Sequence, residues 1–226
     1  MLTVPTTDSA GLDSSVRPDA IAAALRRDIL APALGSSDAL ITEAYVSRAY
    51  SVARPTARIA IDRLVTEGFL LREPHHAARI NRLGRDDIDD LFISRAALES
   101  TAAELLAARG GVIPGSALAA HHALLRLDQN APYTLHDTTF HHALVCGAGA
   151  ARLARLHQLL MGEIELCIAQ VEAHRLRSIA EVAAEHQRIL DSIAAGEADE
   201  ARQYARDHVL SSRDRLVAHY DATHGR

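Results

Sequence analysis

The sequence predicts a mainly α-helical protein in which a small basic module precedes a larger acidic helical bundle. Two observations predict this fold class. Apolar residues recur at spacings of three and four along most of the chain, which is typical of amphipathic helices. Charge is also unevenly distributed, because residues 44–84 hold seven Arg against three acidic residues, a window of +4 in a chain of net charge −5.

The first module is expected to contain three helices and a hairpin. Residues 1–16 are rich in Ser, Thr and Asp without periodicity, so we expect a disordered tail there. The apolar spacing predicts helices near 18–31, 40–49 and 55–67, then strands at 69–72 and 77–80. This order is typical of a winged helix-turn-helix DNA-binding domain, which we assign to residues 17–82.

The second module, residues 83–222, is expected to be all-helical. Helices are predicted at 86–109, 115–128, 133–147, 150–174, 178–195 and 197–219. Short loops between successive helices favour an antiparallel α-helical bundle.

Composition excludes several protein classes. All 24 basic residues are arginine, so enzymes that depend on a lysine Schiff base, a P-loop lysine or a lysine nucleophile are excluded. Cys146 and Cys167 fall in predicted helices, where we expect small core residues rather than a disulfide framework. The chain lacks a signal-peptide pattern, and no apolar stretch approaches the roughly 20 residues that span a bilayer. We therefore expect a cytoplasmic protein without a membrane partner.

The third helix of the basic module presents Thr56, Arg58 and Arg63 opposite its apolar stripe. Arginine at the start of such a helix can reach guanine edges or phosphates in the major groove. The alternative is a solvated helix face, which helix charges usually form. The order of the surrounding elements favours DNA binding.

Several ionisable residues of the second module fall on apolar helix faces. His186 and His208 lie within two such faces, and Asp137 and His141 share a third with Phe140. Buried ionisable groups need partners, and a metal supplies one shared partner. Three imidazoles and one carboxylate predict a divalent metal site, with zinc favoured and nickel, iron or manganese as alternatives. A hydrogen-bonded core network without metal is the competing interpretation.

Arg95 also falls on an apolar face, with Glu99 one helical turn further along the chain. A buried guanidinium requires an anion. That anion is either Glu99 or a bound carboxylate.

Residues 41–61, ITEAYVSRAYSVARPTARIAI, resemble the GntR family signature, and LVTEGFLL resembles the L-x-x-E-G-L that follows it. The resemblance implies that Arg54 and Arg58 contact DNA, with Thr56 beside them. Arg48, in the same basic window, and His76, at the wing tip, are further candidates, although a plain exposed turn is an alternative for His76. Ser51 stands where the family usually has a turn glycine.

The second module resembles the FCD ligand-binding domain of the FadR subgroup through SRAALES, DTTFH, EHQRIL and ARDHVL, and its six predicted helices are similar to the VanR-type branch. The resemblance implies that Asp137, His141, His186 and His208 hold a divalent metal beside a small organic acid effector. It places Arg95 near the effector carboxylate. Glu99, one helical turn after Arg95, is a further candidate for the effector site.

These patterns predict a transcriptional regulator rather than an enzyme. A palindromic double-stranded operator requires two DNA-binding heads, so we expect a homodimer. The alternative from another class is a metal-dependent hydrolase of HD type, suggested by His136-Asp137. It is disfavoured because His136 points about 100° away from Asp137 on a helix, and because it leaves the basic module unexplained.

Overall fold

The computed structural model describes residues 17–31, 34, 39–128, 131–170 and 176–225. The chain separates into two compact units, Met1–Arg82 and Leu83–Arg226. The tail that we predict at residues 1–16 lies outside the described residues.

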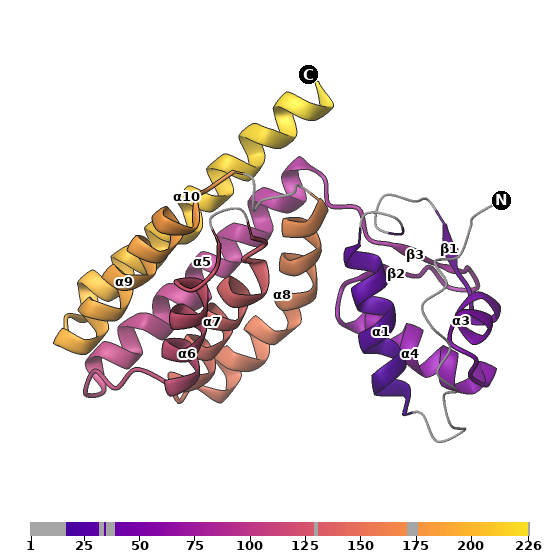
Figure 1. Ribbon diagram of the computed structural model, residues 1–226, viewed down its shortest axis with the longest axis horizontal. Coiled ribbons are helices and arrows are strands. Elements are labelled where there is room, and N and C mark those ends of the chain that lie inside the picture. The colour runs from indigo at the N-terminus through magenta and orange to yellow at the C-terminus, as the bar shows by residue number, and fades with distance from the viewer. Residues whose placement is uncertain (1–16, 32–33, 35–38, 129–130, 171–175, 226) are drawn as a thin grey trace. The chain divides into compact units, whose positions relative to one another are not determined.

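The first unit combines helices with a small antiparallel sheet (Figure 1). Its elements are α1 (Pro18–Leu30), β1 (Leu40–Ile41), α3 (Glu43–Ala49), α4 (Arg54–Thr66), β2 (Leu70–Leu71) and β3 (Ala78–Ile80). Helices α1 and α3 both pack against α4, and the strand order is β1-β3-β2. The predicted stripe of α1 forms part of the core, because Ile21, Leu25 and Ile29 are all buried.

The second helix begins later than the sequence predicts. Leu40 and Ile41 pair with Arg79 and Ala78 instead, so the wing sheet has a third strand that we did not predict. The Thr42 hydroxyl then accepts a hydrogen bond from the Tyr45 backbone N–H, at 3.1 Å, and caps the start of α3. A two-residue strand is too short to show an alternation pattern, which is why the apolar spacing was misassigned to the helix.

Residues with a left-handed backbone conformation lie before and after α4. Gly68, with φ of 80°, ends α4 and turns the chain into β2. Ser51, with φ of 53°, lies in the turn between α3 and α4. The position that favours glycine is therefore occupied here by a residue with a side chain.

The second unit is a bundle built around α5 (Figure 1). Its helices are α5 (Arg85–Ala108), α6 (Gly115–Leu124), α7 (Thr134–Gly147), α8 (Ala151–Gln170), α9 (Ile179–Ala195) and α10 (Ala198–His224). Helix α5 contacts α7, α8, α9 and α10. It runs antiparallel to α10, as ion pairs show: Arg85 at its start joins Asp221, and Glu104 near its end joins Arg202.

Helix ends differ from prediction at two places in this bundle. Helix α6 ends at Leu124 rather than residue 128, and α10 continues to His224 rather than residue 219. The last part of the helix predicted over 150–174 lies outside the described residues. No helix within the described ranges has both the length and the apolar character to cross a bilayer.

Candidate functional site

Three helices of the second unit bring the four predicted metal ligands together. Asp137 and His141 lie one turn apart on α7, His186 lies on α9 and His208 lies on α10. All four side chains are buried, and one potential ligand atom from each lies within 4.8 Å of the others. Helix periodicity predicted that each of these side chains faces inward. The packing of the three helices brings them to one place.

The distances within this cluster suit a shared cation. The Nε2 atoms of His141 and His208 are 3.0 Å apart, and Oδ1 of Asp137 lies 3.7 Å from Nε2 of His141. Neither ring nitrogen of His186 makes a hydrogen bond within the described part of the chain, although Nε2 lies 3.3 Å from Oδ1 of Asp137. Because an unsatisfied buried imidazole is costly, a metal that accepts its lone pair fits this observation.

Burial favours the neutral form of two of the imidazoles. It lowers the pKa of His186 to about 3 although Asp137 opposes the shift, and it lowers the pKa of His208 although Glu185 opposes it. For Asp137, burial alone would raise the pKa, but His141 and His186 outweigh it and hold the pKa well below its ordinary value. Neutral imidazole and ionised carboxylate are the forms that bind metal.

His141 differs from the other two imidazoles. Burial alone would lower its pKa, but the Glu99 carboxylate outweighs burial and raises it. A metal would therefore have to displace a proton from this residue.

Two further carboxylates hold the outer ring nitrogens of the ligands. Nδ1 of His141 lies 2.7 Å from Oε2 of Glu99, and Nδ1 of His208 lies 2.7 Å from Oε2 of Glu185. Such contacts fix the tautomer and turn Nε2 toward the centre, as carboxylates behind metal-binding histidines commonly do. The sequence pattern did not identify Glu185, and the preference of ligating histidines for a carboxylate partner is the signal that points to it.

The structure identifies the anion that Arg95 requires. Nε of Arg95 donates to Oε1 of Glu99 at 2.7 Å, and Nε2 of His157 lies 3.0 Å from the same oxygen. Burial would raise the pKa of Glu99, but Arg95 and His141 outweigh it and hold the pKa well below its ordinary value. Glu99 is therefore an ionised counter-ion that joins Arg95 to a predicted metal ligand.

A small cavity opens to solvent beside Asp137, with about 450 Å³ of atom-free space when the adjoining open solvent is included. It is lined by Phe92, Arg95, Tyr133, Thr134, Asp137, Ile168, Leu176, Arg177, Val182, Ser212, Arg215 and Leu216. Of the two predicted effector residues, Arg95 lines this cavity and Glu99 does not. Basic and apolar side chains therefore line the same cavity as Asp137, one of the four predicted metal ligands.

Sequence reasoning missed two arginines of this cavity. Arg177 lies just before α9, where we expected only a break between helices. Arg215 lies seven residues after His208 on α10, and this spacing placed it on the same helix face. That spacing was available in the sequence as a signal.

The first unit has a second hollow between the start of α4 and the wing, with about 630 Å³ of atom-free space when the adjoining open solvent is included. Arg54 and His76, both predicted DNA contacts, line it together with Arg72. Arg72 was not singled out from the sequence. It forms an ion pair with Asp62 that ties the wing to α4.

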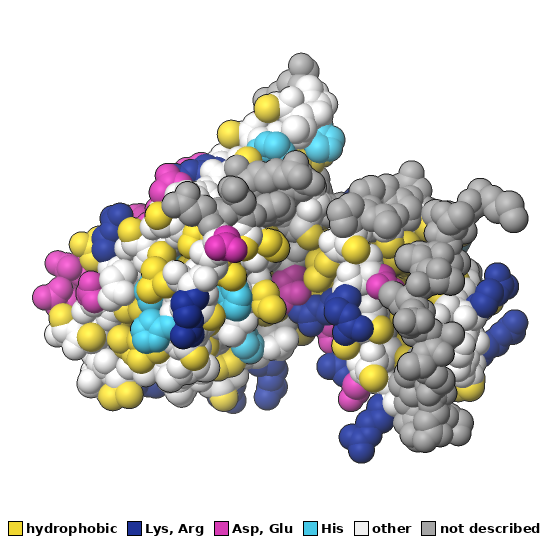
Figure 2. All heavy atoms as spheres, in the orientation of Figure 1, with side chains coloured by type: hydrophobic (Ala, Val, Ile, Leu, Met, Phe, Trp, Pro, Cys, Tyr) yellow, Lys and Arg dark blue, Asp and Glu magenta, His cyan; other side chains and the backbone are white. Residues whose placement is uncertain are grey.

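The other predicted DNA contacts lie outside this hollow. Arg48 and Arg58 are exposed, on α3 and α4, and Thr56 is half-buried. The Arg58 guanidinium is 3.9 Å from the Asp62 carboxylate, a loose surface pair that leaves it accessible. Figure 2 shows arginine side chains projecting from the surface of this unit.

The two cysteines differ from each other. Cys167 is buried, as expected, and burial raises the pKa of its thiol to about 12. Cys146 is exposed, so its expected place in the core was wrong. It lies on the outer face of α7, one turn after His142.

Comparison with known families identifies both units. Residues 18–80 match the model of bacterial regulatory proteins of the gntR family, and residues 90–211, more than half of the chain, match the FCD domain. The chain belongs to the GntR family. It is a DNA-binding transcriptional regulator of the FadR-like subgroup, with a helix-turn-helix domain followed by a helical FCD domain. The predicted fold class and family are confirmed.

Individual GntR-type proteins are similar to this regulator. The uncharacterised HTH-type transcriptional regulator BphR of Paraburkholderia xenovorans (strain LB400) is 27% identical over 83% of this chain and 80% of its own length. A GntR regulator from Rhodococcus sp. RHA1 has a similar structure, with a TM-score of 0.69, 20% identity and coverage of 89% of this chain and 97% of its own. E. coli McbR/YncC has a TM-score of 0.67, 16% identity and coverage of 90% and 98%.

The family excludes the enzyme alternative. GntR proteins with FCD domains are transcription regulators, and no finding supports a hydrolase. His136, which the hydrolase interpretation makes a ligand, does not belong to the cluster of Asp137, His141, His186 and His208.

Proposed function

We propose that this GntR regulator binds its operator under the control of a small organic acid that docks beside a divalent metal. The observation that carries the proposal is the buried cluster of Asp137, His141, His186 and His208, which adjoins a cavity lined by arginines. A bound metal would supply a positive centre that attracts an effector carboxylate.

The ligand chemistry supports zinc as the metal, with nickel, iron or manganese as alternatives. Three imidazole nitrogens and one carboxylate oxygen form a mixed donor set. Glu99 and Glu185 orient two of these imidazoles from behind. A core network without metal would leave His186 without a hydrogen bond, which makes that interpretation the weaker one.

The effector is assigned to the cavity beside Asp137. Arg95 lines this cavity and offers a guanidinium whose charge is already balanced by Glu99. Glu99 therefore acts as a counter-ion behind Arg95, and not as an effector contact.

We assign operator contacts to Arg48, Arg54, Thr56 and Arg58 on the helices and to His76 on the wing. The exposed arginines at the start of α4 supply charge for phosphates and donors for base edges. A palindromic operator would be bound by a homodimer, and the effector would shift the population of head arrangements in that dimer. The protein is expected to act in the cytoplasm, where its DNA lies.

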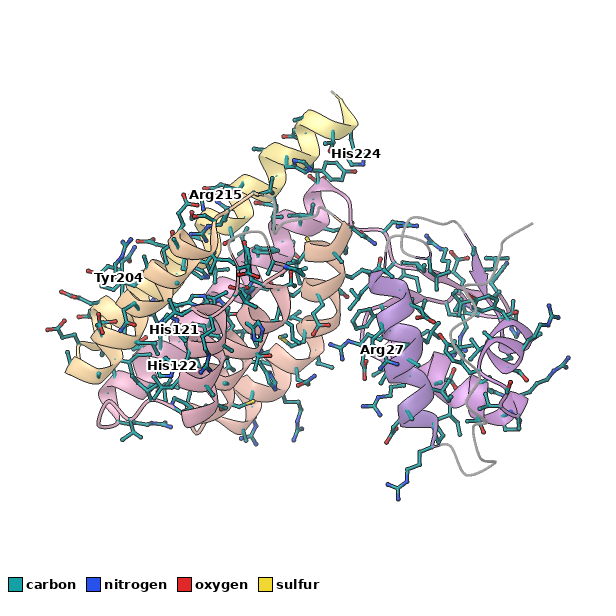
Figure 3. The ribbon with its side chains drawn as sticks, viewed as in Figure 1. Arg27, His121, His122, Tyr204, Arg215 and His224 are labelled. Carbon is teal, nitrogen blue, oxygen red and sulfur yellow. The ribbon has the colours of Figure 1, made fainter. Side chains whose placement is uncertain are left out.

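Metal analysis tests the assignment of a metal to the cluster of Asp137, His141, His186 and His208. Purified wild-type protein, stripped with a chelator and reloaded with zinc, is expected to retain about one zinc per chain. His186→Ala and His208→Ala are expected to lose most of it. His122→Ala is the matched control, because His122 is exposed on α6 and does not belong to the cluster (Figure 3). Unchanged zinc content in both cluster variants would overturn the metal assignment.

Selection of binding sites from random DNA tests the assigned operator contacts. Sites are first selected from random-sequence DNA by the wild-type protein, and binding to them is then measured for Arg58→Ala. Loss of a guanidinium that reads a base is expected to weaken specific binding by roughly 10-fold or more. Arg27→Ala, which removes an exposed arginine of α1, is the matched control. Wild-type affinity of the Arg58 variant would refute the assignment of the recognition helix.

A further inference from the structure

The charge balance of the cavity beside Asp137 distinguishes its arginines from one another. Arg95 is neutralised by Glu99 at 2.7 Å, and both side chains are buried. Arg177 is neutralised by Glu185 at 2.5 Å, and its Nη1 also donates to the Ser212 hydroxyl at 3.2 Å. Each of these two guanidinium groups therefore has a carboxylate partner within the protein. Nε of Arg177 is nevertheless shielded from solvent without a hydrogen-bond partner among the described residues.

The structure describes no ion pair of this kind for Arg215, although the exposed Glu181 carboxylate lies near enough to interact with it. The Nη1 atom of Arg215 is shielded from solvent, yet it has no hydrogen-bond partner among the residues that the structure describes. Arg215 lies on α10 (Figure 3). Because a shielded guanidinium N–H without an acceptor is costly, this atom marks a place for an anionic group of a ligand.

The metal centre contributes a second unbalanced charge. A divalent ion held by three neutral imidazoles and the Asp137 carboxylate keeps a net charge of about +1. Arg215 adds another positive charge at the same cavity. A ligand with a single carboxylate would leave one of the two uncompensated in a partly buried site.

We infer that the effector carries two anionic groups, one directed to the metal and the other paired with Arg215. This inference rests on the proposed function. The remaining walls indicate what joins the two groups, because Phe92, Ile168, Val182 and Leu216 line the cavity with apolar surface. A short hydrocarbon segment between two carboxylates matches that surface. The chemical class is therefore a dicarboxylic acid.

Calorimetric titration of the zinc-loaded, full-length protein tests this inference. The probes are the straight-chain dicarboxylates from malonate to adipate, each compared with the monocarboxylate of equal carbon number. Wild-type protein is expected to bind the best dicarboxylate at least about 10-fold more tightly than its matched monocarboxylate, since a charge-assisted hydrogen bond contributes on this scale.

Three variants isolate the role of Arg215. In Arg215→Gln the preference for the dicarboxylate is expected to disappear while monocarboxylate binding stays at the wild-type level. Arg215→Lys keeps the charge and is expected to keep part of the preference. Arg213→Gln is the matched control on the same helix, because Arg213 pairs with Asp89 and Asp214 away from the cavity lining. Circular dichroism of each variant checks that the bundle is folded.

The outcomes separate this inference from the proposed function. Equal binding of both acids by the wild type, or a full preference in Arg215→Gln, would overturn the dicarboxylate inference and leave metal-assisted effector binding intact. Absence of binding by every acid in zinc-loaded wild-type protein would overturn both. Loss of the dicarboxylate preference in Arg215→Gln, with the preference retained in Arg213→Gln, supports the inference.

Discussion

Replacement of Glu99 by Gln is expected to destabilise the second unit severely, because it removes the charge that balances a buried guanidinium. The Glu99 carboxylate contacts Arg95, His141 and His157 at 2.7, 2.7 and 3.0 Å. Exposure of the Arg95 and Glu99 side chains is only 3% and 4%, so water cannot replace the lost charge. Glutamine retains one oxygen acceptor but leaves the guanidinium without an anion.

The expected loss follows from the cost of breaking a buried ion pair. Removing one partner of such a pair costs about 3–5 kcal/mol, and we expect the lower end because the amide oxygen still accepts one hydrogen bond. Since domains are stable by only about 5–15 kcal/mol, the loss is a large part of the total. Zinc affinity is expected to fall about 10- to 100-fold as well, because His141 loses the carboxylate that orients it.

The assay is urea unfolding of the full-length, metal-free protein, followed by circular dichroism at neutral pH. Glu104→Gln is the matched control, because half-buried Glu104 pairs with exposed Arg202 at the surface and its loss is expected to cost less than about 1 kcal/mol. If Glu99→Gln lost no more stability than Glu104→Gln, the buried network would not have the energetic role that its geometry indicates.

The same variant gives a prediction for pH. Because the pKa of Glu99 in the folded protein is well below 4.5, its ordinary value, the stabilisation is fully present above that value and is lost as pH falls toward the lower, folded-state pKa. The difference in unfolding free energy between wild type and Glu99→Gln is therefore expected to shrink in acid, below about pH 4.5. Near neutral pH it is expected to grow as pH falls, because Glu99 also raises the pKa of His141. A difference that kept growing below pH 4.5 would contradict the assignment of Glu99.

Two further predictions concern the backbone and the thiols. Ser51→Gly is expected to stabilise the protein by roughly 0.5–1 kcal/mol, because a left-handed φ of 53° strains any residue with a Cβ. Urea unfolding measures the gain. Ala49→Gly, at the end of α3, is the control, and it is expected to lower stability instead. Disulfide exchange with a chromogenic reagent at pH 8 is expected to modify Cys146 in the native protein, whereas Cys167, buried and with a pKa of about 12, reacts only after unfolding. Loss of stability in Ser51→Gly would refute the strain argument, and rapid native labelling of both thiols would refute the burial of Cys167.

The sequence predicted the helices well because their period of 3.6 residues repeats many times along each element. The same period assigned Asp137, His141, His186 and His208 to buried faces, which the structure confirms. It failed for β1, because two residues show no period and their partner strand lies far along the chain. It also misplaced Cys146, since a small apolar residue near the edge of a helix face is compatible with either side.

Sequence alone thus determined which residues face inward and which side-chain chemistry each helix brings to the interior. Tertiary structure decided how these groups pair: Glu185 with His208, and Glu99 with Arg95 and His141. It also left Nη1 of Arg215 without a hydrogen-bond partner among the described residues. The physical reason is that periodicity is a property of one helix, whereas contacts between helices depend on their crossing and axial shift. Only those quantities determine whether a buried charge is already balanced or remains available to a ligand.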